Sequence, residues 1–141
     1  MIEPRRATLK DVSDIAKIIN DWIDSTQWME RDQPAEEIEE LIRAGLPKRE
    51  IWVLGDPVTA YLSCEAEIDH IWGFYCAVPG TGQGKRLLDK VKEGRDFLSL
   101  NTHVPNTRAH HFYQREGFVP VKEFAPEPPS QIRELRMEWR R

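Results

Sequence analysis

Apolar residues near the N-terminus recur at the spacing of a helix. One stripe is formed by Val12, Ile15, Ile18, Ile19 and Trp22, while most of the charged residues in between fall on the opposite side. Thr8 precedes the stripe, and Asp11 follows Thr8 by three positions, an arrangement typical of a capping box. The pattern therefore predicts a helix from Thr8 to about residue 24, preceded by a short first strand at residues 5–7.

A second helix is predicted from Ala35 to Ala44. Pro34 suits the first helical position, and Gly45 suits the position after the last turn. The polar side of this helix carries four acidic residues, namely Glu36, Glu37, Glu39 and Glu40. They indicate either a solvated face or a funnel for a cationic substrate.

The rest of the chain alternates between strand and helix patterns. Strands are predicted at residues 50–54, 58–64, 65–78, 97–102, 118–121 and 132–139, and helices at 86–94 and 106–116. The first two of these strands form a hairpin about Gly55-Asp56-Pro57, and Ala125–Ser130 is a proline-stiffened excursion between the last two. The order β-α-α-β-β-β-α-β-α-β-β predicts an α/β fold around one mixed, mostly antiparallel sheet.

Composition narrows the classes of function. The chain has 141 residues and is expected to form a single domain over 1–141. A formal net charge of −4 does not favour nucleic acid as a partner, and no apolar run is long enough to favour a membrane. Cys64 and Cys76 have no metal-ligand spacing, and we expect buried free thiols. With no signal-peptide pattern at the N-terminus, these features predict a cytoplasmic protein without a metal.

The stretch Val78 to Leu88 carries three alternating glycines, Gly80, Gly82 and Gly84, between a predicted strand and a predicted helix. Backbone N–H groups at the start of a helix attract anions, and glycine lets the backbone approach a ligand closely. We therefore expect this loop to bind a diphosphate. It misses the G-x-x-x-x-G-K-[ST] pattern at Pro79 and Arg86, and it also misses G-x-G-x-x-G. A plain glycine-rich connection remains an alternative.

Two segments resemble the signatures of one family. Gly82 and Gly84 match the end of the acyl-CoA loop [RQ]-x-x-G-x-[GA], and Asn106 to Phe118 matches N-x-x-A-x-x-F-Y-x-x-x-G-F. The sequence thus resembles the GCN5-related N-acetyltransferases (GNAT family). It departs from the family at Pro79, which stands where Arg or Gln is usual and has no N–H to donate. This departure predicts either a lower cofactor affinity or a different path of the loop.

The resemblance implies a GNAT-like acyl-CoA N-acyltransferase fold, with helices on both faces of a sheet that splays at the cofactor site. It implies an N-acetyltransferase that uses acetyl-CoA (coenzyme A) as co-substrate and transfers the acetyl group directly to a primary amine of a small molecule. A non-catalytic acyl-CoA-binding or regulatory module is the alternative, and a nucleotide-binding protein is a third hypothesis. Paired copies are frequent in the family, so a homodimer is one of the open oligomeric states.

The resemblance also implies roles for individual residues. Tyr113 would protonate the leaving thiolate; the alternative is a packed tyrosine. The cofactor-binding residues would be Phe74, Cys76, Gly80, Thr81, Gly82, Gln83, Gly84, Lys85, Asn106, Arg108 and Tyr113. The connection Ser25–Gln33, with Trp28 and Met29, would line the acceptor pocket; the alternative is a surface loop with one aromatic anchor.

For the general base, alternate residues of the strand leading to the glycine loop share one face. Glu65, Glu67 and Asp69 are expected on that face. Because members of the family often place a water-activating Glu on this strand, the resemblance implies Glu67 as the first candidate and Asp69 as the second, with an exposed acidic edge as the alternative. His70 is interpreted as a core histidine in preference to a second base. His110 and His111 diverge by about 100° on a helix, so they do not form a metal pair.

Overall fold

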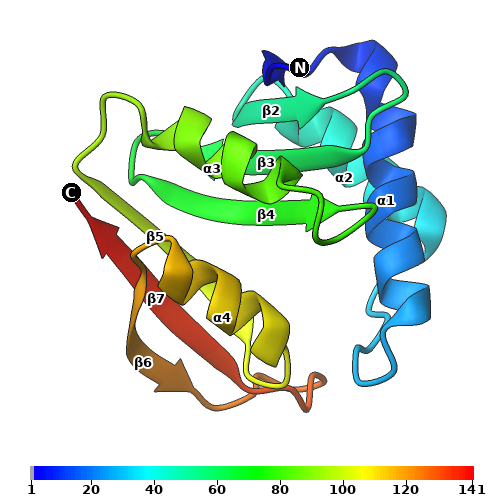
Figure 1. Ribbon diagram of the computed structural model, residues 1–141. Coiled ribbons are helices and arrows are strands. Elements are labelled where there is room, and N and C mark those ends of the chain that lie inside the picture. Colours follow the sequence, from blue (N-terminus) through cyan, green and yellow to red (C-terminus); the bar gives the residue numbers. More distant parts are fainter. Residues whose placement is uncertain (1) are drawn as a thin grey trace.

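The computed structural model describes residues 2–141 (Figure 1). Its strands are β1 (Arg5–Arg6), β2 (Glu50–Leu54), β3 (Ala60–Glu65), β4 (His70–Cys76), β5 (Phe97–His103), β6 (Val119–Phe124) and β7 (Glu134–Arg140). Its helices are α1 (Val12–Ser25), α2 (Ala35–Gly45), α3 (Gln83–Lys92) and α4 (Thr107–Arg115), with a short 3₁₀ turn at Leu9–Asp11 before α1. The order of elements is the one that the sequence predicts.

All seven strands belong to one sheet in the order β1-β2-β3-β4-β5-β7-β6. Every neighbouring pair is antiparallel except β4 and β5, which run parallel. The predicted mixed, mostly antiparallel sheet is confirmed.

Helices cover both faces of the sheet. Alternation along β2 separates two cores: Ile51 and Val53 face α1 and α2, whereas Leu54 faces α3. The core on the α3 side also holds Tyr113 of α4 and extends to β5 and β7. The predicted helices on both faces are confirmed, and an apolar core lies between the sheet and the helices on each face.

The sheet opens between β4 and β5. These strands pair at only two positions, His70 with Ser99 and Ile71 with Leu100, and then diverge. The register between β3 and β4 shifts at Ser63/Cys64, so that Trp72 is an extra residue on β4. A bulge bends the strand that carries it. The bulge thus lies just where β4 turns away from β5, and the splay implied by the resemblance is confirmed.

The predicted strand at residues 65–78 begins too early. Glu65 ends β3, residues 66–69 form a turn, and β4 starts at His70. Asp69 adopts a left-handed backbone with φ of 52°, which aspartate tolerates in turns. The predicted common strand face for Glu67 and Asp69 is therefore wrong, because antiparallel strands β3 and β4 need these residues to reverse the chain.

Helix α3 begins three residues earlier than predicted. Gly82, with φ of 80°, stands immediately before it, and Gln83, Gly84 and Lys85 form its first turn. A Cβ on Gly84 would lie 3.3 Å from Phe112 Cζ and 3.6 Å from Phe74 Cζ. The bare glycine backbone thus allows α3 to begin close against β4 and α4.

The first strand is fastened to the start of α1. Asp11 accepts hydrogen bonds from both terminal nitrogens of Arg5, each at 2.9 Å, and from the Thr8 backbone N–H at 2.8 Å. These bonds lower the pKa of Asp11 although its burial opposes the shift.

Candidate active site

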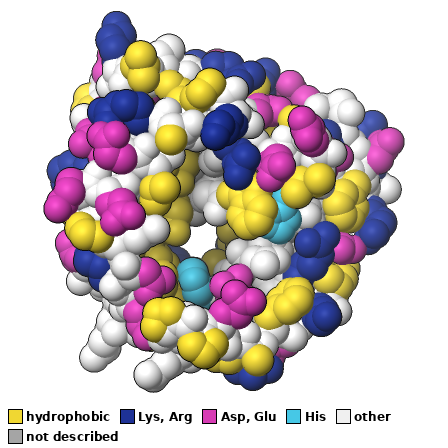
Figure 2. All heavy atoms as spheres, turned by 180° about the vertical axis from the view of Figure 1, so that it is seen from behind, with side chains coloured by type: hydrophobic (Ala, Val, Ile, Leu, Met, Phe, Trp, Pro, Cys, Tyr) yellow, Lys and Arg dark blue, Asp and Glu magenta, His cyan; other side chains and the backbone are white. Residues whose placement is uncertain are grey.

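A cavity of about 100 Å³ occupies the opening between β4 and β5. We call it the central cavity; it is lined by Trp22, Ile71, Trp72, Gly73, Phe74, Tyr75, Leu100, Asn101, Thr102, His103, Asn106, Ala109 and Tyr113. From behind, a hollow bordered by hydrophobic and histidine side chains opens near the middle of the molecule (Figure 2). The cavity therefore coincides with the break in the sheet.

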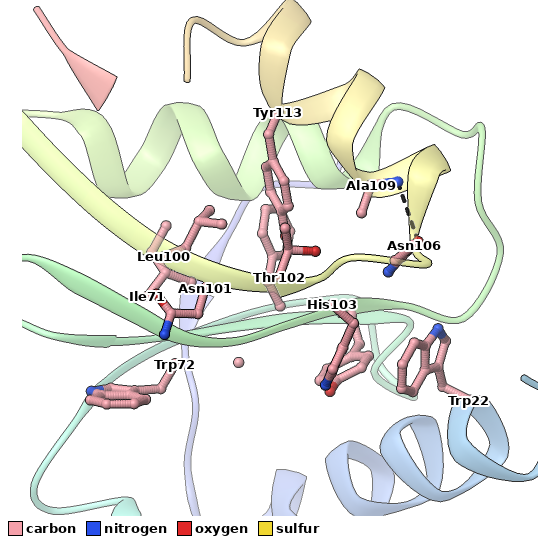
Figure 3. Close-up of a pocket in the computed structure, with 13 residues that line it drawn as sticks. Trp22, Ile71, Trp72, Leu100, Asn101, Thr102, His103, Asn106, Ala109 and Tyr113 are labelled. Atoms are coloured by element: carbon pink, nitrogen blue, oxygen red, sulfur yellow. Dashed lines mark hydrogen bonds between the residues drawn. The ribbon is translucent and has the colours of Figure 1, made fainter. Parts of the chain in front are cut away.

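The central cavity joins the two faces of the sheet. Tyr113 reaches it from α4 on one side of the strands, whereas His103 of β5 and Trp22 of α1 lie on the other side (Figure 3). Alternation along β5 explains the separation, because His103 and Asn101 point away from the face to which Leu100 and Thr102 belong. A molecule lying between the strands would meet both sides at once.

Tyr113 is buried, with 9% of its surface exposed, and its ring packs against Phe74, Phe112 and Phe118 with centroids 5.5–6.1 Å apart. Its hydroxyl makes no hydrogen bond to any other residue in the range 2–141. Burial raises the pKa of Tyr113, so the hydroxyl keeps its proton at neutral pH. The geometry gives a proton donor beside the cavity rather than a tyrosine whose hydroxyl is satisfied elsewhere.

His103 is a residue that the sequence did not single out. It ends β5 and is half-buried, with its ring 6.2 Å from Trp22 and 5.5 Å from Trp28 between centroids. Burial lowers the pKa of His103, opposed by the negative charges of Glu134 and Asp32. The imidazole is therefore neutral at pH 7 and can accept a proton. A histidine at the end of a central strand, three residues before Asn106, was the signal available in the sequence.

The glycine loop has the conformation of an anion-binding turn. Gly80 and Gly82 both have left-handed backbones, with φ of 81° and 80°, and a Cβ on Gly82 would meet open space. No hydrogen bond within residues 2–141 uses the N–H groups of Gly80 through Lys85. Successive free N–H groups at the start of a helix suit a diphosphate. The loop residues Thr81 and Gln83 are held locally: Thr81 Oγ1 donates to Val78 O at 3.0 Å, and Gln83 Nε2 donates to Thr59 Oγ1 at 2.8 Å.

Other predicted cofactor residues lie around the same opening. Asn106 lines the cavity and caps α4, since its Oδ1 accepts from the Ala109 N–H at 3.3 Å. Phe74 also lines the cavity, whereas Cys76 packs beneath Gly84. The Arg108 guanidinium lies 4.0 Å from the place of a Cβ on Gly80, at the mouth of the loop.

Lys85 does not extend over the glycine loop. Its Nζ pairs with Glu116 at 3.2 Å and with Asp89 at 3.4 Å. Both ion pairs lie at the surface and occupy the Lys85 ammonium. In a P-loop, the lysine at this position instead contacts the phosphates of the ligand. The arrangement argues against the nucleotide-binding hypothesis.

Of the two residues predicted to line the acceptor pocket, Trp28 lies beside the central cavity and Met29 does not. Trp28 contacts Trp22 at 5.6 Å between ring centroids and borders the wall of the central cavity. Met29 is half-buried in the same connection, but it does not line the central cavity. It does not line the neighbouring hollow around Trp28 and Ile132 either. Trp28 extends the aromatic wall around His103, which fits both the predicted acceptor pocket and a surface loop with one aromatic anchor.

The predicted bases do not reach this site. Glu67 is exposed in the turn at the opposite end of β4 from the glycine loop, about 20 Å away along a seven-residue strand. Asp69 accepts from Arg95 Nε at 2.9 Å, and Arg95 also bonds Glu50 at 2.9 Å. Neither Glu67 nor Asp69 lines the central cavity. His70 is 4% exposed and shares a hydrogen bond with Ser99 Oγ at 2.7 Å, which confirms its interpretation as a core histidine.

Solved structures show how widely this architecture occurs. YjaB from Escherichia coli, in its apo form, has a TM-score of 0.79 at 21% identity, over 99% of this chain and 97% of that one. A ribosomal-protein-alanine N-acetyltransferase from Brucella melitensis has a TM-score of 0.74 at 18% identity, over 98% and 99% of the two chains. A GNAT superfamily phosphinothricin acetyltransferase from Sinorhizobium meliloti, in complex with AcCoA, has a TM-score of 0.74 at 15% identity, over 99% and 88%. The chain has the GNAT fold.

The GNAT fold is recognisable here only from the structure and the two short sequence signatures. No protein-family model and no curated protein sequence matches the chain. Across residues 2–141, no helix is long and apolar enough to cross a bilayer, and no group of three or more His, Cys, Asp or Glu side chains is arranged to hold a metal ion.

Proposed function

We propose that this protein transfers the acetyl group of acetyl-CoA directly to a primary amine of a small molecule. The observation that carries the proposal is the central cavity, which has a proton donor, Tyr113, on one face of the sheet and a proton acceptor, His103, on the other. The GNAT fold and the complex of a structural neighbour with AcCoA support the choice of acyl donor.

The residues around the opening fit coenzyme A. The free N–H groups of Gly80 to Lys85 would hold its diphosphate, and Arg108 adds a cation at the mouth of the loop. Beyond Ile71, β4 still pairs with β3, but its edge toward β5 is open, so an extended arm can lie between β4 and β5. Pro79 has no N–H to donate, but every residue from Gly80 to Lys85 has one.

His103 and Tyr113 divide the proton transfers. The amine nitrogen forms a bond to the thioester carbonyl carbon as its proton passes to His103 Nδ1 or Nε2, and the carbon–sulfur bond breaks as the sulfur takes the Tyr113 proton. The two residues exchange these protons with water before the next turnover. Burial raises the pKa values of Cys64 and Cys76 to about 11, so both remain thiols and neither is suited to a covalent intermediate.

Free thiol release from acetyl-CoA in the presence of a panel of primary amines tests the proposal. We expect amine-dependent release that requires both Tyr113 and His103. Coenzyme A binding without release on any amine would favour the second candidate, a non-catalytic acyl-CoA-binding module, for which the proline in place of the usual Arg or Gln is the supporting observation.

A further inference from the structure

The side of the central cavity that faces α1 is a wall of aromatic rings. The Trp22 ring lies 5.2 Å from Tyr75, 5.6 Å from Trp28 and 6.2 Å from His103 between centroids. These rings come from α1, β4, β5 and the connection after α1. Aromatic surfaces attract both flat apolar groups and cations.

The cavity has no fixed charge to pair with an acidic substrate. Within residues 2–141, none of its lining side chains is Asp, Glu, Lys or Arg. The nearby arginines have ion pairs of their own: Arg31 bonds Asn20, Asp24 and the Gln33 carbonyl. Arg133 bonds Glu123 in a half-exposed pair and lines the neighbouring hollow, not the central cavity. A carboxylate drawn into this cavity would lose its water without gaining a cation.

The electrostatics at the cavity favour a positive charge. Two carboxylates, Glu134 and Asp32, are close enough to His103 to oppose the lowering of its pKa. A protonated amine approaching His103 is attracted by both, whereas an anion is repelled.

A second hollow of about 420 Å³ shares Trp28 with this wall; we call it the side hollow. Val104, Pro105 and Ile132 give it apolar sides, and Glu30 and Arg133 add one charge of each sign. Glu30 joins its two loops by accepting from Ser130 Oγ at 3.3 Å and Gln131 N at 2.9 Å. The central cavity has room for little beyond the reacting groups. The side hollow, in contrast, is large enough for the body of a small molecule.

We infer that the acceptor is a primary amine on a flat apolar body that carries no acid group, with its nitrogen at His103 and its body against Trp22 and Trp28. This inference rests on the proposed function and names the substrate class of the same site. The uncharged lining of the central cavity selects against an acid group close to the nitrogen, as in an amino acid, and the aromatic wall selects for an aromatic amine over an aliphatic one.

Matched substrates test the inference on the full chain. Phenethylamine and phenylalanine share an aromatic ring and a primary amine but differ by a carboxylate, so their kcat/KM values for thiol release isolate the acid group. We expect phenethylamine to be favoured at least about 100-fold, because a carboxylate beside the nitrogen has no cationic partner in the lining of the central cavity. Trp28→Ala should lower kcat/KM for phenethylamine about tenfold and leave that for propylamine within about twofold, whereas a merely structural role of Trp28 would lower both equally.

Calorimetric binding of the same compounds in the presence of coenzyme A separates the two proposals. Binding of phenethylamine but not phenylalanine, without thiol release, would support the substrate class and contradict the transferase. Thiol release with phenylalanine equal to that with phenethylamine would overturn the substrate class and leave the transferase standing. A preference for the α-amine of an unblocked tripeptide over phenethylamine would overturn it as well.

Discussion

Tyr113 and His103 line one cavity from opposite faces of the sheet. Tyr113 belongs to a helix that packs on one face, and His103 belongs to the strand that borders the opening. Because the sheet is open between β4 and β5, the two side chains can act on the same molecule without contacting each other. Burial keeps the tyrosine protonated and the histidine neutral, which are the states that an acid and a base require.

The Tyr113→Phe variant should lower kcat about 100-fold and leave the KM for acetyl-CoA nearly unchanged. The substitution removes the hydroxyl but keeps the ring that packs against Phe74 and Phe118. Steady-state thiol release measures both constants, and thermal unfolding checks that the variant is folded. A kcat equal to that of the unaltered protein would exclude Tyr113 as the acid.

Activity should fall at acidic pH with a midpoint below 6.5. The pKa of His103 is lowered from 6.5 in the folded protein, so protonation removes the base only below that value. His103→Gln should lower kcat about 100-fold and abolish this acidic limb. The pH profile of kcat at saturating acetyl-CoA and amine is the measurement, and an unchanged acidic limb in the variant would assign the titration to another group.

The same shift predicts that His103 destabilises the fold in acid. A histidine with a lowered pKa in the folded state binds its proton more readily when unfolded, so its contribution to stability is present above pH 6.5 and is lost as the pH falls. Comparing His103→Gln with the unaltered protein by urea unfolding at pH 7.5 and 5.0 should show a smaller loss of stability in the variant on acidification.

Gly82→Ala should weaken coenzyme A binding more than tenfold, because a Cβ would enter the open space at the glycine loop and the left-handed backbone would be strained. Gly94→Ala is the matched control: Gly94 also has a positive φ, of 73°, and also faces open space, but it follows the far end of α3. Calorimetry should show normal affinity for the control. Equal weakening in both variants would point to a loss of stability rather than a loss of contact.

Glu67→Gln should leave kcat within about twofold, because Glu67 is exposed in a turn that does not line the cavity. Asp69→Asn should instead lower stability by about 1 kcal/mol by weakening the bond to Arg95. Thiol release and urea unfolding of the two variants measure these effects. A hundredfold loss of kcat in Glu67→Gln would restore that residue as the base.

The element order, the glycine loop and the signature around Tyr113 were predictable because each is encoded locally. Helical periodicity identified α1, and left-handed glycines with a helix behind them were predictable from the spacing of Gly80 and Gly82. The start of α3 was placed too late because Gly84 is an unfavourable helix residue that close packing against Phe112 requires here. The carboxylates were misplaced for a different reason: an apolar Ile68 within the β3–β4 turn made the strand pattern look continuous.

The sequence by itself determined the order of helices and strands, the glycine loop before α3, and that Tyr113 lies in the helix after β5. The tertiary structure alone decided that Trp72 forms a bulge, that β4 leaves β5 beyond Ile71, and that His103 meets Trp22 and Trp28 at the resulting cavity. The physical reason is the separation along the chain over which each kind of interaction acts. Helical spacing and turn residues act over a few positions, whereas strand register and the convergence of side chains depend on contacts between residues far apart in the chain, such as Trp22 and His103.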